Sequence, residues 1–175
     1  LGLEIQDGPK WITIPHYQKR KLLNIKFRSL PPQEKTFRRV TGCQSILFNQ
    51  DILEGKPETV FITEGEIDAV TLYDQGIKNV IGATTGAGSF DPSWIDALQG
   101  IKKIYLVYDQ DDAGQKGARE IERRLGYERC FNIVLPDGQD VNDYFKAGHD
   151  VFDFQNLVNQ ARQFDVAGIA SFKDC

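Results

Sequence analysis

The sequence predicts an α/β fold, with a mainly parallel four-stranded sheet flanked by helices and a small β-rich subdomain before it. From residue 59 onward, short runs of β-branched and aromatic residues alternate with stretches of helical spacing, which is typical of βαβ units. Before that point, two segments of alternating apolar and polar residues surround a polar turn, which is typical of a hairpin. We therefore expect three parts: a basic β-rich subdomain at 1–58, an α/β domain at 59–150, and a C-terminal helix and tail at 151–175.

The first part is predicted to contain two strands, at 11–17 and 22–28, joined by a polar turn at 18–21. Residues 49–58 are polar and contain Gly and Pro, so they are interpreted as the connector to the second part.

Positive charge gathers on the second strand of this hairpin and just after it. Lys26 and Arg28 alternate with apolar residues, so both side chains are expected on one exposed face. Lys35 and Arg38 add charge around Phe37. Such a face suits a phosphate backbone, but an ordinary solvated strand face carries such charges equally often.

The α/β domain alternates regularly between predicted strands and helices. Strands are expected at 60–63, 79–81, 103–108 and 130–134. Helices are expected at 67–75, 92–98, 113–125, 141–147 and 152–164. Gly76 and Gly126 stand where helix C-caps belong.

Composition and charge exclude several classes of protein. The 175 residues contain 41% hydrophobic residues, no apolar run long enough to cross a membrane and no signal-peptide pattern. Three cysteines lie far apart, so we expect no zinc site in this chain and a reducing, cytoplasmic compartment. The chain starts at Leu1 and has no methionine, so a fragment of a longer protein is expected.

The net charge of −4 hides an asymmetry between the two halves. Residues 1–58 contain 10 basic and 6 acidic residues, whereas residues 59–150 contain 9 basic and 16 acidic ones. This pattern indicates a polyanion partner for the first part and a metal for the second, with ordinary solvated surfaces as the equally favoured alternative.

Carboxylates follow two predicted strands at the points where helices begin. Glu64 ends the first strand of the α/β domain, and Asp109 and Asp111 end the third. Parallel strands end at the same rim, where ligands bind in open α/β sheets. Clustered carboxylates repel one another unless a cation lies between them, and all-oxygen ligands favour Mg²⁺, with Mn²⁺ as a substitute.

Other candidates have two interpretations each. Asp140, after the fourth strand, is a further metal ligand or the N-cap of the next helix, and the capping role is favoured from the residues alone. Asp112 has the same alternatives, again with the cap favoured. The glycine-rich loop at 82–89 fits neither a dinucleotide-binding fingerprint nor a P-loop, which excludes both. His16 and His149 have no partners at ligand spacing and are interpreted as structural or surface residues.

Two motifs, Glu64-Gly65 with Asp68 and then Asp109 with Asp111, each lie at a predicted strand–helix junction. In this order they resemble the toprim domain, which DnaG-type primases share with topoisomerases of types IA and II and some nucleases. Segments 63–68, 111–116 and 135–142 look more specifically like the primase half of phage-type primase–helicases. The resemblance is firm over 59–150 and weaker over 1–58, which is similar to the N-terminal subdomain of the same primase core. The residues of the two motifs are Glu64, Gly65, Asp68, Asp109, Asp111 and Gly114.

The resemblance implies roles for individual residues. It reverses the preference for Asp140, which becomes a metal ligand. Catalytic roles are implied for Glu64, Asp109 and Asp111, and metal binding for Glu64, Asp109, Asp111 and Asp140. Structural roles beside the site are implied for Gly65, Asp68 and Gly114. Nucleotide or template contacts are implied for Lys26, Arg28, Lys35 and Arg38.

The resemblance also implies a nucleotidyltransferase, a Mg²⁺-dependent DNA primase core that makes short RNA primers. Its expected partners are single-stranded DNA, ribonucleoside triphosphates and a replicative helicase, fused or separate, with no membrane. The sequence contains neither the zinc module nor the helicase of such proteins, so the fragment alone is expected to prime weakly. A toprim nuclease and a non-catalytic DNA-binding module that acts through a helicase are the alternatives.

Overall fold

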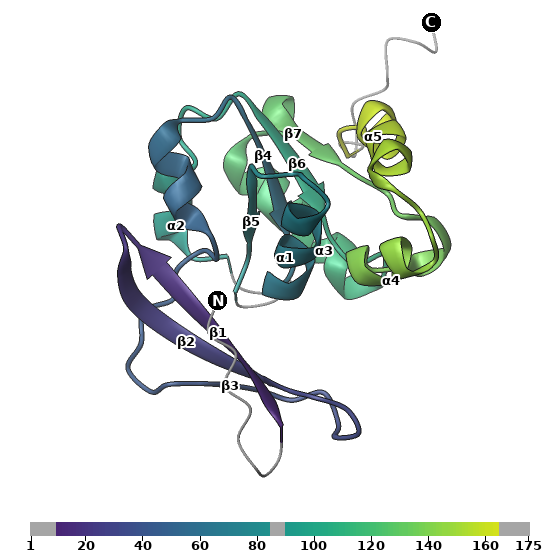
Figure 1. Ribbon diagram of the computed structural model, residues 1–175. Coiled ribbons are helices and arrows are strands. Elements are labelled where there is room, and N and C mark those ends of the chain that lie inside the picture. The colour runs from purple at the N-terminus through teal and green to yellow at the C-terminus, as the bar shows by residue number, and fades with distance from the viewer. Residues whose placement is uncertain (1–9, 85–89, 165–175) are drawn as a thin grey trace, which may run out of the picture.

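A computed structural model, which describes residues 10–84 and 90–164, shows two sheets of different kinds (Figure 1). The first is an antiparallel sheet in the order β1-β2-β3. Lys19 and Arg20 form its two-residue turn with φ of 50° and 62°, which suits a tight hairpin. The predicted hairpin is confirmed, and a short third strand joins it. The strands are β1 (Trp11–Gln18), β2 (Lys21–Ser29) and β3 (Phe37–Arg39).

The second sheet is fully parallel and has the order β5-β4-β6-β7. Every predicted strand and helix is present, although the last helix ends at Gln160 instead of 164. The strands are β4 (Thr59–Thr63), β5 (Val80–Gly82), β6 (Lys103–Val107) and β7 (Cys130–Asn132). The α-helices are α1 (Glu66–Asp74), α2 (Pro92–Ala97), α3 (Asp112–Leu125), α4 (Val141–Lys146) and α5 (Val151–Gln160). Short 3₁₀ helices are η1 (Gln50–Gly55), η2 (Tyr127–Arg129) and η3 (Pro136–Gly138).

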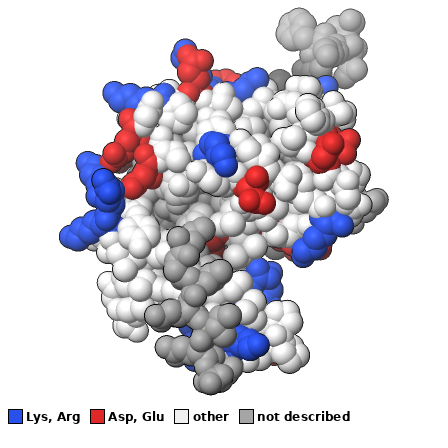
Figure 2. Space-filling view, viewed as in Figure 1, with Lys and Arg blue, Asp and Glu red and all other residues white. Residues whose placement is uncertain are grey.

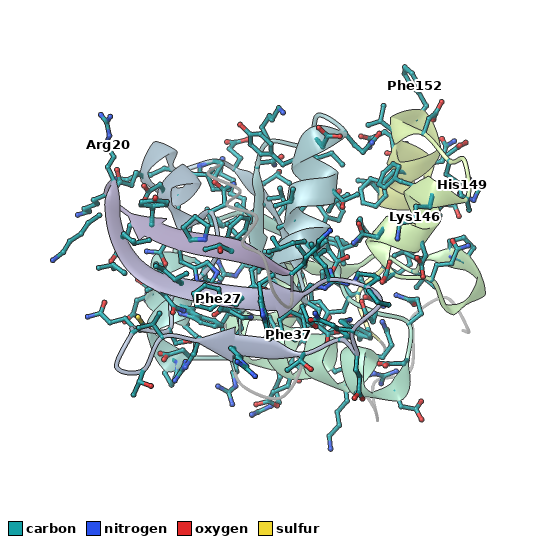
Figure 3. The ribbon with its side chains drawn as sticks, turned by 60° about the horizontal axis from the view of Figure 1, so that its bottom comes forward. Arg20, Phe27, Phe37, Lys146, His149 and Phe152 are labelled. Atoms are coloured by element: carbon teal, nitrogen blue, oxygen red, sulfur yellow. The ribbon has the colours of Figure 1, made fainter. Side chains whose placement is uncertain are left out.

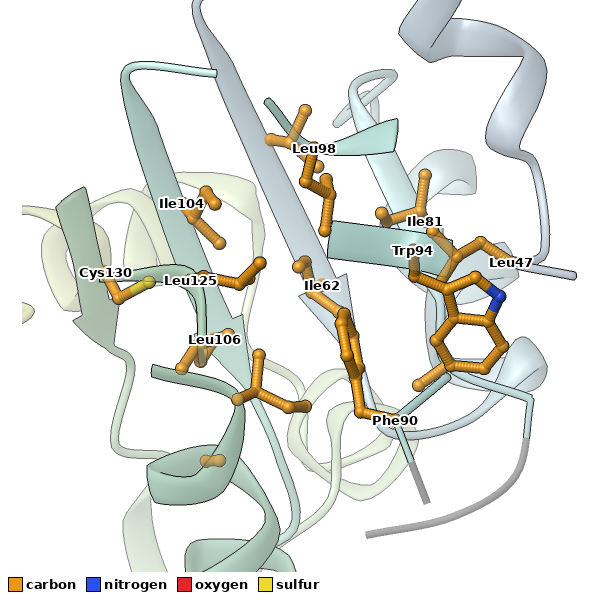
Figure 4. Close-up of a cluster of buried hydrophobic side chains, with 14 of the residues drawn as sticks. Leu47, Ile62, Ile81, Phe90, Trp94, Leu98, Ile104, Leu106, Leu125 and Cys130 are labelled. Atoms are coloured by element: carbon orange, nitrogen blue, oxygen red, sulfur yellow. The ribbon is translucent and has the colours of Figure 1, made fainter. Parts of the chain in front are cut away.

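Alternating side chains of the parallel sheet enter two separate hydrophobic cores, because successive residues of a strand point to opposite faces. Ile62 and Leu106 pack with α2 and α3 on one face, where Trp94 and Leu47 lie beside Ile81 (Figure 4). The opposite face packs against α1, α4 and α5 through residues such as Phe61, Tyr105, Leu72, Tyr144 and Phe154. Helices on both faces and parallel strands between them are the predicted arrangement.

Helix α1 ends where the sequence predicts, because Gly76 adopts a φ of 97°. The Gly76 N–H bonds the Tyr73 carbonyl, and the Ile77 N–H bonds the Leu72 carbonyl. These two hydrogen bonds form the Schellman motif that terminates many helices at a glycine. After this cap the chain continues directly to β5.

The antiparallel sheet turns its polar face toward the α/β domain, which the sequence did not predict. Asn24 is buried, and the Lys26 side chain is only 14% exposed. The outer face lies toward the viewer in Figure 3, where Phe27 is labelled. Strand alternation places Leu23 and Ile25 on the same face, and all three residues are half-buried. Lys26 and Arg28 do share a face, as expected, but for Lys26 the expected exposure is wrong because that face packs against another domain.

The predicted connector holds the two sheets together. Asp51 of η1 accepts hydrogen bonds from the backbone of Lys19 and Arg20 at the hairpin tip. Just before η1, Phe48 exchanges two backbone hydrogen bonds with Gly82 at the end of β5. No helix in the described ranges is long and apolar enough to span a membrane.

Candidate active-site cleft

A cleft of about 610 Å³ separates the antiparallel sheet from the rim where the parallel strands end. In Figure 2 the antiparallel sheet forms the lower lobe and the α/β domain the larger upper body. The acidic wall of this cleft comes from the rim: Glu64, Asp68, Asp109, Asp140 and Asp143. The basic wall comes mainly from β2 and β3: Lys26, Arg28, Lys35, Arg38 and Arg39. The cleft therefore brings together three of the four predicted metal ligands and all four predicted nucleotide contacts.

Asp111 is the predicted ligand that does not line this cleft. It is exposed and N-caps α3, accepting a hydrogen bond from the Gly114 N–H at 2.7 Å. The capping role expected for Asp112 therefore belongs to Asp111, and Asp112 is the first residue of the helix. Asp140 combines both of its interpretations, since it lines the cleft and also caps α4 by accepting from the Asp143 N–H at 2.8 Å.

The acidic wall concentrates negative charge. Burial raises the pKa of Asp109, and the neighbouring charges of Asp140 and Asp111 raise it further. Burial, with the charges of Asp109 and Asp140, raises the pKa of Asp68 to about 7. Lys35 opposes both shifts from across the cleft. The wall is thus a site where a cation would relieve repulsion.

Asp68 also joins two helices. Its Oδ1 accepts a hydrogen bond from Asn142 Nδ2 at 2.9 Å, and Asn142 Oδ1 accepts from the Thr71 hydroxyl at 2.7 Å. These bonds fasten α4 to α1 and so set the position of Asp140, just before Asn142. Asn142 lies in a segment that the sequence singled out, but without an assigned role.

Glycine is required where the acidic wall is most crowded. A Cβ on Gly114 would collide with the Asp109 carbonyl oxygen and lie 2.9 Å from Glu64 Oε2. A Cβ on Gly65 would lie 3.2 Å from Asp68 Oδ2. Both glycines let carboxylates and backbone approach closely, which gives a physical reason for the structural roles expected of them.

The basic wall consists of residues with different surroundings. Strand register places Arg39 opposite Lys26 and Phe37 opposite Arg28, so these four side chains share the cleft face. Arg38 also lines the cleft, but it pairs with Phe27 and its guanidinium lies 4.8 Å from the Trp11 ring centre. Lys35 is exposed and lies 5.9 Å from the centre of the Phe37 ring. The sequence missed Arg39 because β3 was not predicted.

A buried polar cluster joins the two walls, and the sequence did not predict it. Glu66 Oε1 lies 2.6 Å from Lys26 Nζ and 3.3 Å from Nε2 of His16, which is fully buried. Burial raises the pKa of Glu66, but His16 and the charge of Lys26 outweigh it, so the pKa lies below its usual value. His16 is therefore structural, as interpreted, and its partner comes from 50 residues away in the chain.

The donor set of the acidic wall fits Mg²⁺, because the donors are carboxylate oxygens that repel one another. No three His, Cys, Asp or Glu side chains within residues 10–84 and 90–164 converge on one metal position. Mg²⁺ usually keeps several waters and takes one or two carboxylates plus substrate phosphates, so it needs no such cage.

Comparison of the sequence with known proteins identifies its family. A family model described as Toprim-like matches residues 61–145. Gene 57 protein of Mycobacterium phage D29 is 30% identical over 118 residues, which cover 67% of this chain and 75% of that protein. The chain belongs to the Toprim-like family. The Twinkle homolog protein of Arabidopsis thaliana is 29% identical over 186 residues, 93% of this chain but only 26% of its own length.

The similarity to solved structures extends beyond the α/β domain, because it covers most of this chain. The primase fragment of the bacteriophage T7 primase–helicase superposes with a TM-score of 0.73 at 22% identity, over 88% of this chain and 65% of that one. A DnaG primase catalytic domain bound to single-stranded DNA gives 0.72 at 19% identity, over 87% and 52%. This Toprim-like chain therefore has the fold seen in primase catalytic cores.

Proposed function

We propose that this chain is the catalytic core of a DNA primase, which joins ribonucleoside triphosphates into short RNA primers on single-stranded DNA. The observation that carries the proposal is the two-walled cleft, with carboxylates of the strand rim facing cations of β2 and β3. A reaction between a triphosphate and a 3′-hydroxyl needs both charges: cations to hold phosphates and carboxylates to hold a metal. The names of the similar proteins add support, since they include primases and a primase–helicase.

Asp109 and Asp140 would hold Mg²⁺ together with Glu64, with Asp111 at the outer side. Bound Mg²⁺ would neutralise charge on the triphosphate and favour ionisation of the attacking 3′-hydroxyl. Glu64 is a ligand or the general base for that hydroxyl. Gly114 leaves room for the Glu64 carboxylate beside the Asp109 backbone, where an added Cβ would crowd both.

The basic wall would hold the polyanions. Lys35 and Arg39 are exposed on the cleft side, where they can reach triphosphate or template phosphates. Phe37 is 45% exposed beside them and offers a flat surface to a base. Binding through phosphates should weaken as the salt concentration rises. The single-stranded DNA in the similar DnaG structure supports a template partner, and the primase–helicase supports a helicase partner.

The test incubates the protein with single-stranded DNA and Mg²⁺ or Mn²⁺, with and without ribonucleotides, and with a chelator as control. Labelled ribonucleotides reveal primers, and labelled DNA in a parallel reaction reveals cleavage. Primase activity yields products that grow only when ribonucleotides are present and vanish with chelator. Glu64→Gln should abolish the product, whereas Asp112→Asn, an exposed carboxylate outside the cleft, should not. Shortened DNA would indicate a nuclease instead, and DNA binding without either product would indicate a non-catalytic module.

A further inference from the structure

Lys26 reaches across the joint between the two sheets. Its ammonium lies 2.6 Å from Glu66 Oε1 at the start of α1 and donates to the Thr84 carbonyl oxygen at 2.8 Å. Its nitrogen also lies 5.3 Å from the centre of the Phe37 ring. One lysine of the antiparallel sheet is thereby attached to two points of the α/β domain, both next to the strand rim.

The surroundings of Glu66 hold its carboxylate in place. Glu66 is 2% exposed and belongs to the first turn of α1, two residues after Glu64. His16 lies on its other side, packed edge-on against Phe48. A buried carboxylate without a cation would be costly, so the pair with Lys26 is needed for the folded joint.

The backbone around Glu66 is equally confined. A Cβ on Gly82 would lie 3.0 Å from the Gly65 carbonyl oxygen and 3.3 Å from the Glu66 Cα. The turn that carries Glu66 therefore packs directly on the end of β5, just before Thr84. Both acceptors of the Lys26 ammonium are thus anchored to neighbouring parts of the same rim.

The ammonium group has three N–H donors, and these two acceptors engage two of them. The third is available to the cleft, which Lys26 lines. The other cations of the cleft face differ: Arg28, Lys35 and Arg39 form no ion pair in the part of the chain that the structure describes. Lys26 alone among these four is held rigidly by a buried carboxylate.

We propose that Glu66 is a positioning residue, which fixes the Lys26 ammonium at a set distance from the carboxylate rim so that its remaining donor meets a triphosphate oxygen. The inference rests on the proposed function, because it takes a ribonucleoside triphosphate as the ligand. Glu66 itself touches no substrate. Without it, Lys26 would keep its charge but lose its fixed position, and the triphosphate would bind less tightly.

The experiment is a double-mutant cycle of Glu66→Gln and Lys26→Met, measured on the whole chain. The dissociation constant of ATP with Mg²⁺ is determined by titration, separately from primer synthesis. Each single variant should raise it about tenfold, the equivalent of one charge-assisted hydrogen bond. The double variant should bind no more weakly than Lys26→Met alone, because Glu66 acts only through Lys26. In primer synthesis, the KM for ATP should rise more than kcat falls.

Stability and controls separate positioning from a merely structural role. Thermal unfolding without nucleotide should show the single variants destabilised and the double variant partly restored, since it leaves no unpaired buried charge. A restored fold with ATP binding still weakened supports positioning. Glu58→Gln, which breaks an exposed pair with Lys102, should change neither measurement. If Glu66→Gln does not fold, Glu66→Asp replaces it, because its shorter side chain withdraws the carboxylate from Lys26.

Three results overturn the inference: ATP binding by folded Glu66→Gln at wild-type strength, multiplied effects in the double variant, or no ATP binding by the wild-type chain. A wild-type chain that binds ATP but makes no primer refutes the proposed function instead. In that case the binding cycle still decides the role of Glu66.

Discussion

The two walls of the cleft are built by different means, and the difference shows which parts of a site follow from topology. The acidic wall consists of residues that follow parallel strands, so their meeting is dictated by strand direction. The basic wall consists of residues on β2, on β3 and just before β3, so its composition depends on register and on which sheet face docks. Strand direction can be inferred from a sequence, whereas docking depends on the whole fold.

The walls also differ in how their charges are compensated. On the acidic wall, burial and the neighbouring carboxylates raise the pKa of both Asp68 and Asp109. On the basic wall, Lys26 pairs with the buried Glu66, whereas Lys35 forms no ion pair within the described residues and opposes the pKa shift of Asp109 from across the cleft. The acidic wall should therefore govern the chemical step, and the basic wall should govern substrate affinity.

The largest expected effect tests the acidic wall. Asp109→Asn should lower kcat for primer synthesis at least about 100-fold, because it removes charge from the centre of the wall. The KM for ribonucleotides should change much less. Stability should hold or improve, since repulsion from Asp140 is relieved. If Asp109→Asn loses affinity for ribonucleotides but keeps kcat, the proposed division of roles between the two walls is contradicted.

The next effect tests the close packing behind the acidic wall. Gly114→Ala should lower kcat more than about tenfold and destabilise the fold by about 1–3 kcal/mol, because its Cβ overlaps the Asp109 carbonyl and crowds Glu64. Gly55→Ala is the matched control, with no atom within 4 Å of the added Cβ. Steady-state kinetics and urea unfolding measure both quantities. Equal behaviour of the two variants would contradict the packing argument.

A smaller effect is expected from the basic wall. Lys35→Gln should raise the KM for ribonucleotides about tenfold with little change in kcat, since one phosphate contact is lost. Lys56→Gln, which also removes an exposed lysine but lies outside the cleft, should leave KM unchanged. The comparison is sharpened by repeating both at higher salt, where the difference should shrink. A fall in kcat alone for Lys35→Gln would contradict the expectation that the basic wall governs substrate affinity.

The smallest effect concerns stability against pH. With its pKa raised to about 7, Asp68 holds a proton in the folded state that the unfolded chain loses near pH 4. The stability from this proton is complete below about pH 4 and is lost as the pH rises through 7.

Asp68→Asn keeps an acceptor for Asn142 but cannot titrate. Its free energy of unfolding, measured in chelator, should fall less than that of the wild type between about pH 4 and 7. Asp74→Asn, an exposed carboxylate on the same helix, should follow the wild type. If the free energy of unfolding of Asp68→Asn falls with pH as steeply as that of the wild type, the environment of Asp68 does not contribute to the pH dependence of stability.

The sequence was sufficient to predict the α/β elements and to place Glu64 and Asp109 at the same rim. Buried strands of β-branched residues and the carboxylates after them are both local signals. One-residue differences at a helix start were not predictable: Asp111 and Asp112 are equally good caps until the helix has formed.

Docking explains the remaining differences. Period-two alternation places Lys26 and Arg28 on one face, but nothing local reveals that this face packs against Glu66. Arg39 joins them only because the three residues Phe37–Arg39, which follow the two prolines, pair with β2 as strand β3. The glycine-rich loop at 82–89 lies outside the described residues from 85 onward, so its exclusion as a dinucleotide or P-loop site stays a prediction, as does a reducing compartment.

The contact between Phe48 and Gly82 makes the segment just before the connector part of the α/β domain's own architecture. Phe48 covers the outer edge of β5, and Leu47 is fully buried in the core beneath it. A protein cut at residue 58 would expose a strand edge and leave a side-chain-sized hole beside Trp94. The covalent boundary between the two parts thus differs from the physical one, so the α/β domain alone should aggregate or unfold where the joined pair does not.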